Sequence, residues 1–149
     1  MNMNVSYRDF EEKDFGAFRE MVFCLYEEDP EGQPIDDEKL RKTIGESLAH
    51  PEKIRIIMIR ADDVVAGYGI LVFYWSNEYG GDILNIDELY IKKEYRGNRV
   101  ASDFIKNQID TNKNIVAVAV ETTSSNSAAA KLYMQLGFKA SPNYHLVLI

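Results

Sequence analysis

Apolar residues recur along the first third of the chain with the spacing of helices. The first set repeats at three- and four-residue steps and comprises Phe15, Phe18, Val22 and Leu25. We therefore predict a helix over residues 14–26 with one apolar face. Leu40, Ile44 and Leu48 are each four residues apart. This spacing predicts a second helix.

Runs rich in β-branched and aromatic residues predict the strands. These runs cover residues 5–8, 54–60, 64–75, 83–91, 115–120 and 144–149. The second and third runs are separated by a short turn at Asp62-Asp63, so we predict an antiparallel hairpin there. The continuous apolar run 115–120 predicts a strand buried on both faces. Residues 144–149 are predicted to close the chain as the last strand.

Two more helices are predicted in the second half. The first has an apolar face formed by Val100, Phe104, Ile105 and Ile109. It joins strand 83–91 to strand 115–120, and such a unit is expected to be parallel and right-handed. The last helix is predicted to begin near Asn126, with Ser125 as N-cap, and to end at Gly137. Without repeats or a long linker, we expect one domain over residues 1–149.

A basic turn, Arg96-Gly97-Asn98-Arg99, connects strand 83–91 to the following helix. A helix start offers unpaired backbone N–H groups and the positive end of the helix dipole, and the two guanidinium groups add charge there. This layout is typical of phosphate binding. The alternative is an ordinary strand-to-helix connection whose basic residues are solvated.

A second segment, Asn-x-x-Ala-x-x-Leu-Tyr-x-x-x-Gly-Phe over residues 126–138, follows the buried strand. Preceded by Arg-Gly-x-x-Val-Ala at residues 96–101, it resembles the GNAT superfamily of acyl-CoA-dependent N-acetyltransferases. The likeness is close in the second half and general in the first. It implies an α/β (α+β) fold: a mixed, mostly antiparallel central sheet of six or seven strands, with a splayed parallel pair and about four flanking helices.

The resemblance implies acetyl-CoA as acyl donor. In the family, pantetheine lies where two parallel strands splay apart, which here places the backbone of Leu89, Tyr90 and Ile91 beside it. The N–H groups around the pyrophosphate are those of Arg96, Gly97, Asn98, Arg99, Val100, Ala101 and Ser102. Asn126 matches a position that commonly contacts the coenzyme, although a residue at a helix start is equally often structural.

Arg99 departs from the family pattern, which is Arg or Gln, two variable residues, Gly, one variable residue, then Gly or Ala. Arg96 and Ala101 match its ends, whereas Arg99 replaces the middle Gly. We expect Arg99 to donate its backbone N–H from a helical conformation and to pair its guanidinium with a phosphate. The alternative is that its side chain folds over the site and lowers coenzyme affinity.

The resemblance implies direct attack of an amine on the thioester within a ternary complex. A base must take the amine proton, and we prefer Glu88, with Asp87 as second candidate. Adjacent strand residues face opposite ways unless a bulge intervenes. Each acid alone could equally bind substrate charge or pair with a Lys or Arg. The Leu89 N–H matches the oxyanion donor, and Tyr133 matches the acid that protonates the leaving thiolate; packing in the core is the alternative for Tyr133.

The net charge of the chain and the distribution of its acidic residues indicate which acceptor fits. The net charge is −7, from 24 acidic and 17 basic residues, which argues against nucleic acid as the partner. The acids concentrate at residues 27–31 and 36–38, so small cationic amines such as polyamines or aminoglycosides fit best. A peptide N-terminus or a lysine side chain is the alternative acceptor. The alternative explanation of these acidic segments is that they are solvated helix ends, with Asp36 or Asp37 capping a helix.

The remaining features limit cofactors and location. No apolar stretch approaches the roughly 18 residues of a membrane span, and the polar start lacks a signal-peptide core, so we expect a cytoplasmic protein. Cys24, His50 and His145 stand apart from one another and imply neither a disulfide nor a metal. Family members are often dimers, which leaves a homodimer open.

Two further alternatives concern the site as a whole. A coenzyme-binding regulatory or interaction module that has lost catalysis is the second function class, and Arg99 is the feature that permits it. Aromatic residues near the middle of the chain either line an acceptor pocket or pack on the sheet: Tyr74, Trp75 and Tyr79.

Overall fold

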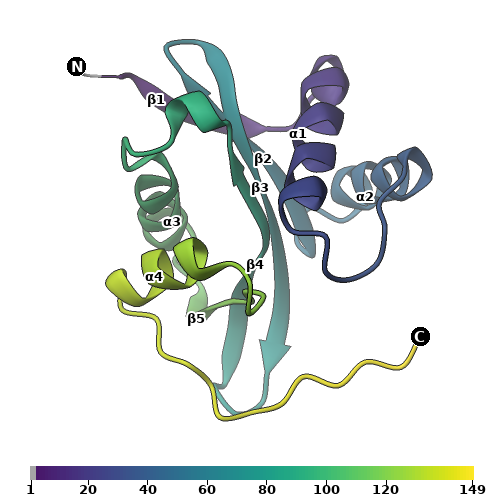
Figure 1. Cartoon of the computed structure of the whole chain (residues 1–149). Coiled ribbons are helices and arrows are strands. Elements are labelled where there is room, and N and C mark those ends of the chain that lie inside the picture. Colours follow the sequence, from purple (N-terminus) through teal and green to yellow (C-terminus); the bar gives the residue numbers. More distant parts are fainter. Residues whose placement is uncertain (1–2) are drawn as a thin grey trace.

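The computed structural model describes residues 3–149 as one mixed sheet with helices on both faces (Figure 1). The strands are β1 (Val5–Asp9), β2 (Ile54–Ala61), β3 (Val64–Ser76), β4 (Gly81–Ile91) and β5 (Ile115–Val120). The helices are α1 (Phe15–Glu28), α2 (Asp37–Ala49), α3 (Val100–Thr111) and α4 (Ser127–Gln135). Short 3₁₀ turns occupy Glu12–Asp14 and Lys93–Tyr95.

The strands follow one another across the sheet in chain order, β1-β2-β3-β4-β5. The first four are antiparallel, and β5 pairs with β4 in parallel. The predicted hairpin is confirmed: Asp62 and Asp63, with φ of 49° and 66°, turn the chain from β2 to β3. Two successive positive φ angles are the geometry that tight hairpins need, and aspartate tolerates them.

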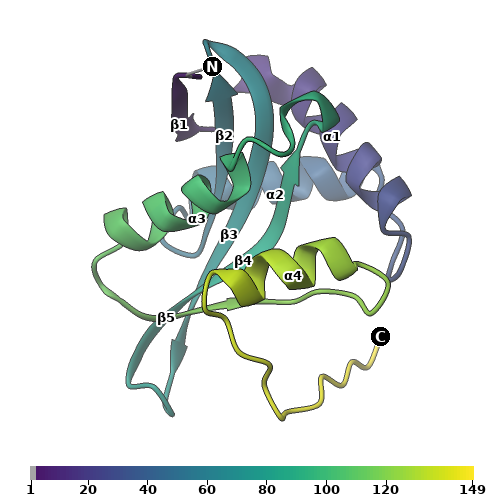
Figure 2. The same cartoon turned by 60° about the vertical axis from the view of Figure 1, so that its left-hand side comes forward.

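Helices α1 and α2 cover one face of the sheet, and α3 and α4 cover the other (Figure 2). Each face has its own apolar core, because the strand side chains alternate between the two sides. Helix α3 lies especially close to β3, where a Cβ on Gly69 would meet the ring of Phe104 at 2.6 Å. The absence of a side chain at Gly69 therefore allows α3 to pack this close to β3. The position of α3 in turn sets that of the basic turn that leads into it.

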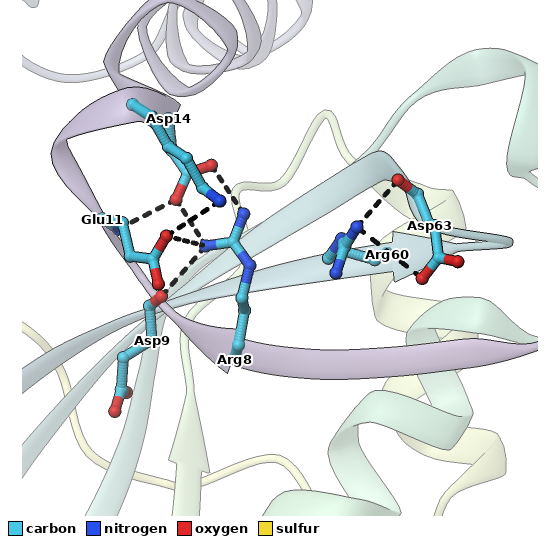
Figure 3. Close-up of polar contacts among 7 residues, drawn as sticks. Arg8, Asp9, Glu11, Asp14, Arg60 and Asp63 are labelled. Atoms are coloured by element: carbon cyan, nitrogen blue, oxygen red, sulfur yellow. Dashed lines mark hydrogen bonds and ion pairs between the residues drawn. The ribbon is translucent and has the colours of Figure 1, made fainter.

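An ion pair fastens β1 to the start of α1 (Figure 3). Arg8 donates from both terminal nitrogens to Asp14, at 2.6 and 2.8 Å, and the Asp14 side chain is only 5% exposed. The Arg8 hydrogen bond lowers the pKa of Asp14 despite its burial. A second contact in Figure 3, from Arg60 to the backbone oxygen of Asp63, ties the β2–β3 turn to its own strand.

The sheet is smaller than predicted, with five strands in the described residues instead of six or seven. Residues 139–149 are irregular, so the predicted last strand 144–149 is wrong. Its large side chains, Tyr144, Leu146, Val147, Leu148 and Ile149, are 69 to 99% exposed. Consequently β5 is an edge strand, each of its residues is at least partly exposed, and the prediction that it is buried on both faces is also wrong.

The helices differ from prediction at a few positions. Leu48 and Ile109 are exposed at the ends of their apolar faces, while Gln108 is buried. Asn126, not Ser125, is the N-cap of α4, because its side chain accepts from the backbone N–H of Ala129 at 3.2 Å. Gly137 has φ of 99°, as expected for a residue just beyond a helix end. No helix in residues 3–149 has the length and apolarity that crossing a membrane requires.

Candidate active site

A β-bulge places the two adjacent acids of β4. Ile70 of β3 lies opposite Glu88, whereas Leu71 lies opposite Ile86, so Asp87 is an extra residue in β4. A regular strand would point Asp87 and Glu88 to opposite faces. With the bulge, both side chains line the same cavity.

The pairing of β4 with β5 ends just before this bulge. It ends at Ile86 opposite Val120, and β4 continues as far as Ile91. On the side away from β3, the β4 backbone from Asp87 to Ile91 therefore has no partner strand among residues 3–149. The predicted parallel pair is confirmed, and β5 itself ends at Val120, where the pairing stops.

A cavity of about 790 Å³, the larger cavity, opens along this free edge of β4, the basic turn, the start of α3 and α4. Every predicted coenzyme residue except Asn98 lines it: Leu89, Tyr90, Ile91, Arg96, Gly97, Arg99, Val100, Ala101, Ser102, Asn126 and Tyr133. The Asn98 amide instead donates to the carbonyls of Tyr95 and Arg96 and stabilises the turn from within.

The basic turn contains two left-handed residues, Gly97 with φ of 81° and Arg99 with φ of 61°. Arg99 is the N-cap of α3, so the expectation that it is helical is wrong. A glycine adopts this conformation without strain, whereas a residue with a Cβ does not. The middle Gly of the family pattern thus stands where the backbone is left-handed, which supplies a reason for it besides close approach of a phosphate.

Arg96 is held on the wall of the larger cavity. Its Nε donates to the Ile91 carbonyl at 2.7 Å, and its Nη2 lies 3.0 and 3.2 Å from the two carboxylate oxygens of Glu28. The guanidinium also lies over the ring of Tyr90, 5.2 Å from its centroid. Arg96 therefore joins the end of α1 to the turn, and its charge is already paired.

A second cavity, of about 460 Å³, lies on the other side of Leu89 and is here called the acidic cavity. Its acidic side chains are Asp29, Glu31, Asp87, Glu88 and Glu121, against a single basic one, Lys39. Partial desolvation within the cavity, reinforced by the charge of Glu121, raises the pKa of Asp87. Such a cavity concentrates cations.

Glu88 has both of its carboxylate oxygens hydrogen-bonded. Tyr26 of α1 donates to its Oε2 and Tyr68 of β3 to its Oε1, both at 2.7 Å. Burial raises the pKa of Glu88, the two phenol donors oppose that rise, and Asp87 adds to it. A carboxyl whose pKa is raised toward neutral pH is a better proton acceptor than an ordinary surface glutamate.

Tyr133 lies where the two cavities meet. The residues that line both cavities are Leu25, Leu89, Asn126, Ala129 and Tyr133. Burial raises the pKa of Tyr133, so its phenol stays protonated at neutral pH. The ring packs edge-on against Phe138, with centroids 5.6 Å apart. The packing role predicted as the alternative is therefore present, and the position at the junction comes in addition to it.

Some acids of the acidic segments at residues 27–31 and 36–38 cap or pair at helix ends, and others line the acidic cavity. Asp36 caps α2 by accepting from the Lys39 N–H at 2.9 Å, and Asp37 pairs with Arg19 at 2.6 Å. In contrast, Asp29 and Glu31 line the acidic cavity. Asp29 also accepts from the Thr123 hydroxyl at 3.0 and 3.1 Å, which joins the loop after α1 to the loop after β5.

Tyr74, Trp75 and Tyr79 lie on neither cavity wall and are exposed, Trp75 by 68%. They therefore lie outside both cavities, and none of the three is buried in the sheet. The residues that sequence reasoning missed come mainly from α1: Leu25, Tyr26 and Glu28. The sequence marks Leu25 only as part of an apolar helix face, and no local pattern marks Tyr26 or Glu28.

Comparisons with known proteins identify the family and the fold. A sequence model of the Acetyltransferase (GNAT) family matches residues 15–138, and no curated protein sequence matches the chain significantly. A possible acetyltransferase from Clostridium difficile 630 is 23% identical, with TM-score 0.80 over 97% of both chains. Aminoglycoside N-acetyltransferase AAC(6')-Iy in complex with CoA is 17% identical, with TM-score 0.76 over 100% of this chain and 97% of its own.

A predicted acetyltransferase from Clostridium acetobutylicum, solved with acetyl-CoA, is 16% identical, with TM-score 0.78 over 97% of this chain and 96% of its own. At such identities the solved structures show a common fold, and the family match over residues 15–138 adds the sequence relationship. The chain therefore belongs to the GNAT acetyltransferase family, acyltransferases whose acyl donor is acetyl-CoA.

Proposed function

We propose that this protein transfers the acetyl group of acetyl-CoA to a primary amine of a small cationic molecule, of polyamine or aminoglycoside type. The observation that carries the proposal is the meeting of two cavities of opposite character at Leu89 and Tyr133. One is suited to an anionic coenzyme and the other to a cationic acceptor. An amine in the acidic cavity then faces a thioester in the larger one.

The larger cavity suits the coenzyme in shape and charge. The free backbone of Leu89 to Ile91 can pair with the pantetheine amides, as a strand edge pairs with an extended ligand. The first N–H groups of α3 supply donors for the diphosphate, and Arg99 and Lys106 add positive charge on the same wall.

Glu88 is proposed to take the proton of the acceptor ammonium, directly or through a water. The nitrogen lone pair then attacks the thioester carbonyl, whose developing negative charge the Leu89 N–H stabilises. As the carbon–sulfur bond breaks, Tyr133 gives its proton to the leaving thiolate, because its burial keeps the phenol protonated. The nitrogen, still protonated after attack, returns its second proton to the Tyr133 phenolate through water, and Glu88 releases the first proton to solvent. Asp87 binds the acceptor's second positive charge and is the alternative base.

The aminoglycoside acetyltransferase among the similar structures agrees with a cationic acceptor, although the likeness of the two proteins is one of fold. The stronger support is the charge of the acidic cavity itself. Five carboxylates and one lysine line it, and they would repel an anionic acceptor.

Two measurements test the proposal. Calorimetric titration with acetyl-CoA should show saturable one-to-one binding, and thiol release should then be followed with polyamines, aminoglycosides and a lysine peptide. Glu88→Gln should lower turnover by about 10²- to 10⁴-fold and leave coenzyme binding intact. Glu38→Gln, an equal charge change on the exposed face of α2, is the control. Absence of coenzyme binding in folded protein, or turnover that is unchanged in Glu88→Gln, would overturn the proposal.

A further inference from the structure

We propose that Tyr26 and Tyr68 are positioning residues that orient the Glu88 carboxylate and favour its ionised form before the acceptor binds. The inference rests on the proposed role of Glu88 as base and extends it to two side chains from other elements. Neither tyrosine belongs to the two sequence motifs on which the family resemblance rests, at residues 96–101 and 126–138.

The geometry allots one phenol to each carboxylate oxygen. Tyr26 reaches Oε2 from the last part of α1, and Tyr68 reaches Oε1 from β3, each at 2.7 Å. The donors stand 62 and 20 residues from Glu88 in the chain. With both oxygens engaged from different directions, rotation of the carboxylate breaks at least one hydrogen bond, so its orientation is defined.

The two phenols differ in their surroundings. Tyr68 is fully buried, with its ring edge-on to Phe18 at 5.1 Å and tilted against Tyr90 at 6.3 Å. Its hydroxyl is therefore fixed by packing. Tyr26 is partly exposed and lines the acidic cavity beside Glu88, so an acceptor in that cavity touches it. Tyr68 thus provides a permanent donor, and Tyr26 a donor at the substrate face.

The two phenols act on the pKa of Glu88. Burial raises the pKa of Glu88 and Asp87 adds to the rise, whereas both tyrosine hydrogen bonds lower it. Burial and the Glu88 charge in turn raise the pKa of Tyr26 and of Tyr68, which keeps both as donors across the neutral range. The other charged side chains around the acidic cavity are Asp29, Glu31, Lys39 and Glu121.

Two donors leave the base usable. An ionised carboxylate has about four lone-pair positions, and the phenols take one on each oxygen. The remaining positions can accept from an ammonium group or from a bridging water. Loss of one phenol removes stabilisation of the charged form, so the titration of Glu88 must move to higher pH.

The test compares pH–rate profiles of wild type, Tyr26→Phe, Tyr68→Phe and the control Tyr7→Phe. The control removes a hydroxyl from β1, where Tyr7 packs edge-on against Phe104. In both test variants the acidic limb of kcat/KM is expected to shift to higher pH, so the loss of rate is larger at low pH than at high pH. Tyr7→Phe should keep the wild-type profile. A uniform loss at every pH, with an unmoved limb, would overturn the proposal.

A second readout requires no turnover. The ¹³C resonance of the Glu88 carboxyl, assigned by its loss in Glu88→Gln, can be titrated in the free protein. Its midpoint should be higher in Tyr26→Phe than in wild type, and an equal midpoint would refute the role of Tyr26. Failure of acetyl-CoA binding or of amine turnover would instead count against the proposed function alone. Because Tyr26 is partly exposed, its phenylalanine variant is expected to fold.

Discussion

Glu28 offers a direct test of how the basic turn meets the coenzyme. Its carboxylate lies 3.0 Å from Nη2 of Arg96 at the wall of the larger cavity, and Lys93 lies 3.9 Å from the same group. A diphosphate entering this cavity must compete with Glu28 for Arg96 and also faces a like charge. Glu28→Gln removes the charge, keeps the side-chain size and leaves Arg96 free to turn toward the ligand.

The expected magnitude follows from the exposure of the pair. The side chains of Arg96 and Glu28 are 42% and 33% exposed, so water screens their attraction. Pairs of this kind contribute about 0.2–1 kcal/mol. Release of Arg96 and loss of one repulsive charge together should favour the coenzyme by about 1 kcal/mol, which corresponds to about a fivefold lower Kd.

Calorimetric titration of acetyl-CoA into wild type and Glu28→Gln measures this difference. Glu27→Gln is the matched control, because Glu27 is the preceding residue, carries the same charge and does not line the larger cavity. It should change affinity far less than Glu28→Gln. If affinity in Glu28→Gln is equal to wild type or weaker, Arg96 does not reach the diphosphate, and its role is to fasten α1 to the turn.

Three other substitutions have defined outcomes. Tyr133→Phe should lower turnover on the order of a hundredfold with little change in acetyl-CoA affinity, because the ring still packs on Phe138; unchanged thiol release would remove it from the mechanism. Arg8→Met should lower the free energy of unfolding, measured in urea, by about 3 kcal/mol, because it leaves the buried Asp14 carboxylate without its ion-pair partner. The lowered pKa of Asp14 makes the pair's stabilisation present above the unfolded pKa of about 3.9 and lost as pH falls through the folded pKa. The acid-induced loss of stability should therefore shrink in Arg8→Met, and an identical pH dependence would contradict this. Arg99→Gly should raise the unfolding free energy by about 1 kcal/mol by relieving the left-handed backbone, whereas Arg99→Ala, which retains Cβ, should show no such gain.

Local patterns were sufficient for the parts of the fold that depend on neighbours in the chain. The hairpin at Asp62–Asp63 and the start of α3 at Val100 follow from turn residues and periodic apolar positions. On the donor side, local pattern was enough only for the basic turn at the start of a helix, whereas the coenzyme contacts of Leu89 to Ile91, Asn126 and Tyr133 were expected from the family resemblance.

The acceptor side depended on contacts that no local pattern encodes. The bulge at Asp87 exists only in the pairing of β4 with β3, and Tyr26 reaches Glu88 from 62 residues away. Residues 144–149 show the opposite failure. Their composition favours a strand, but a strand also needs a partner edge, and in this structure the segment has irregular backbone and exposed side chains.

The two cavities also divide the chain in a way that bears on its evolution. The larger cavity is built mostly from residues 89–136, whereas the outer wall of the acidic cavity is the loop between α1 and α2, anchored to the second half through Asp29 and Thr123. Substitutions, insertions or deletions in residues 30–35 can therefore reshape the acceptor side while the donor side is inherited intact. A single ancestral sequence could in this way give rise to enzymes that share a donor and differ in what they modify.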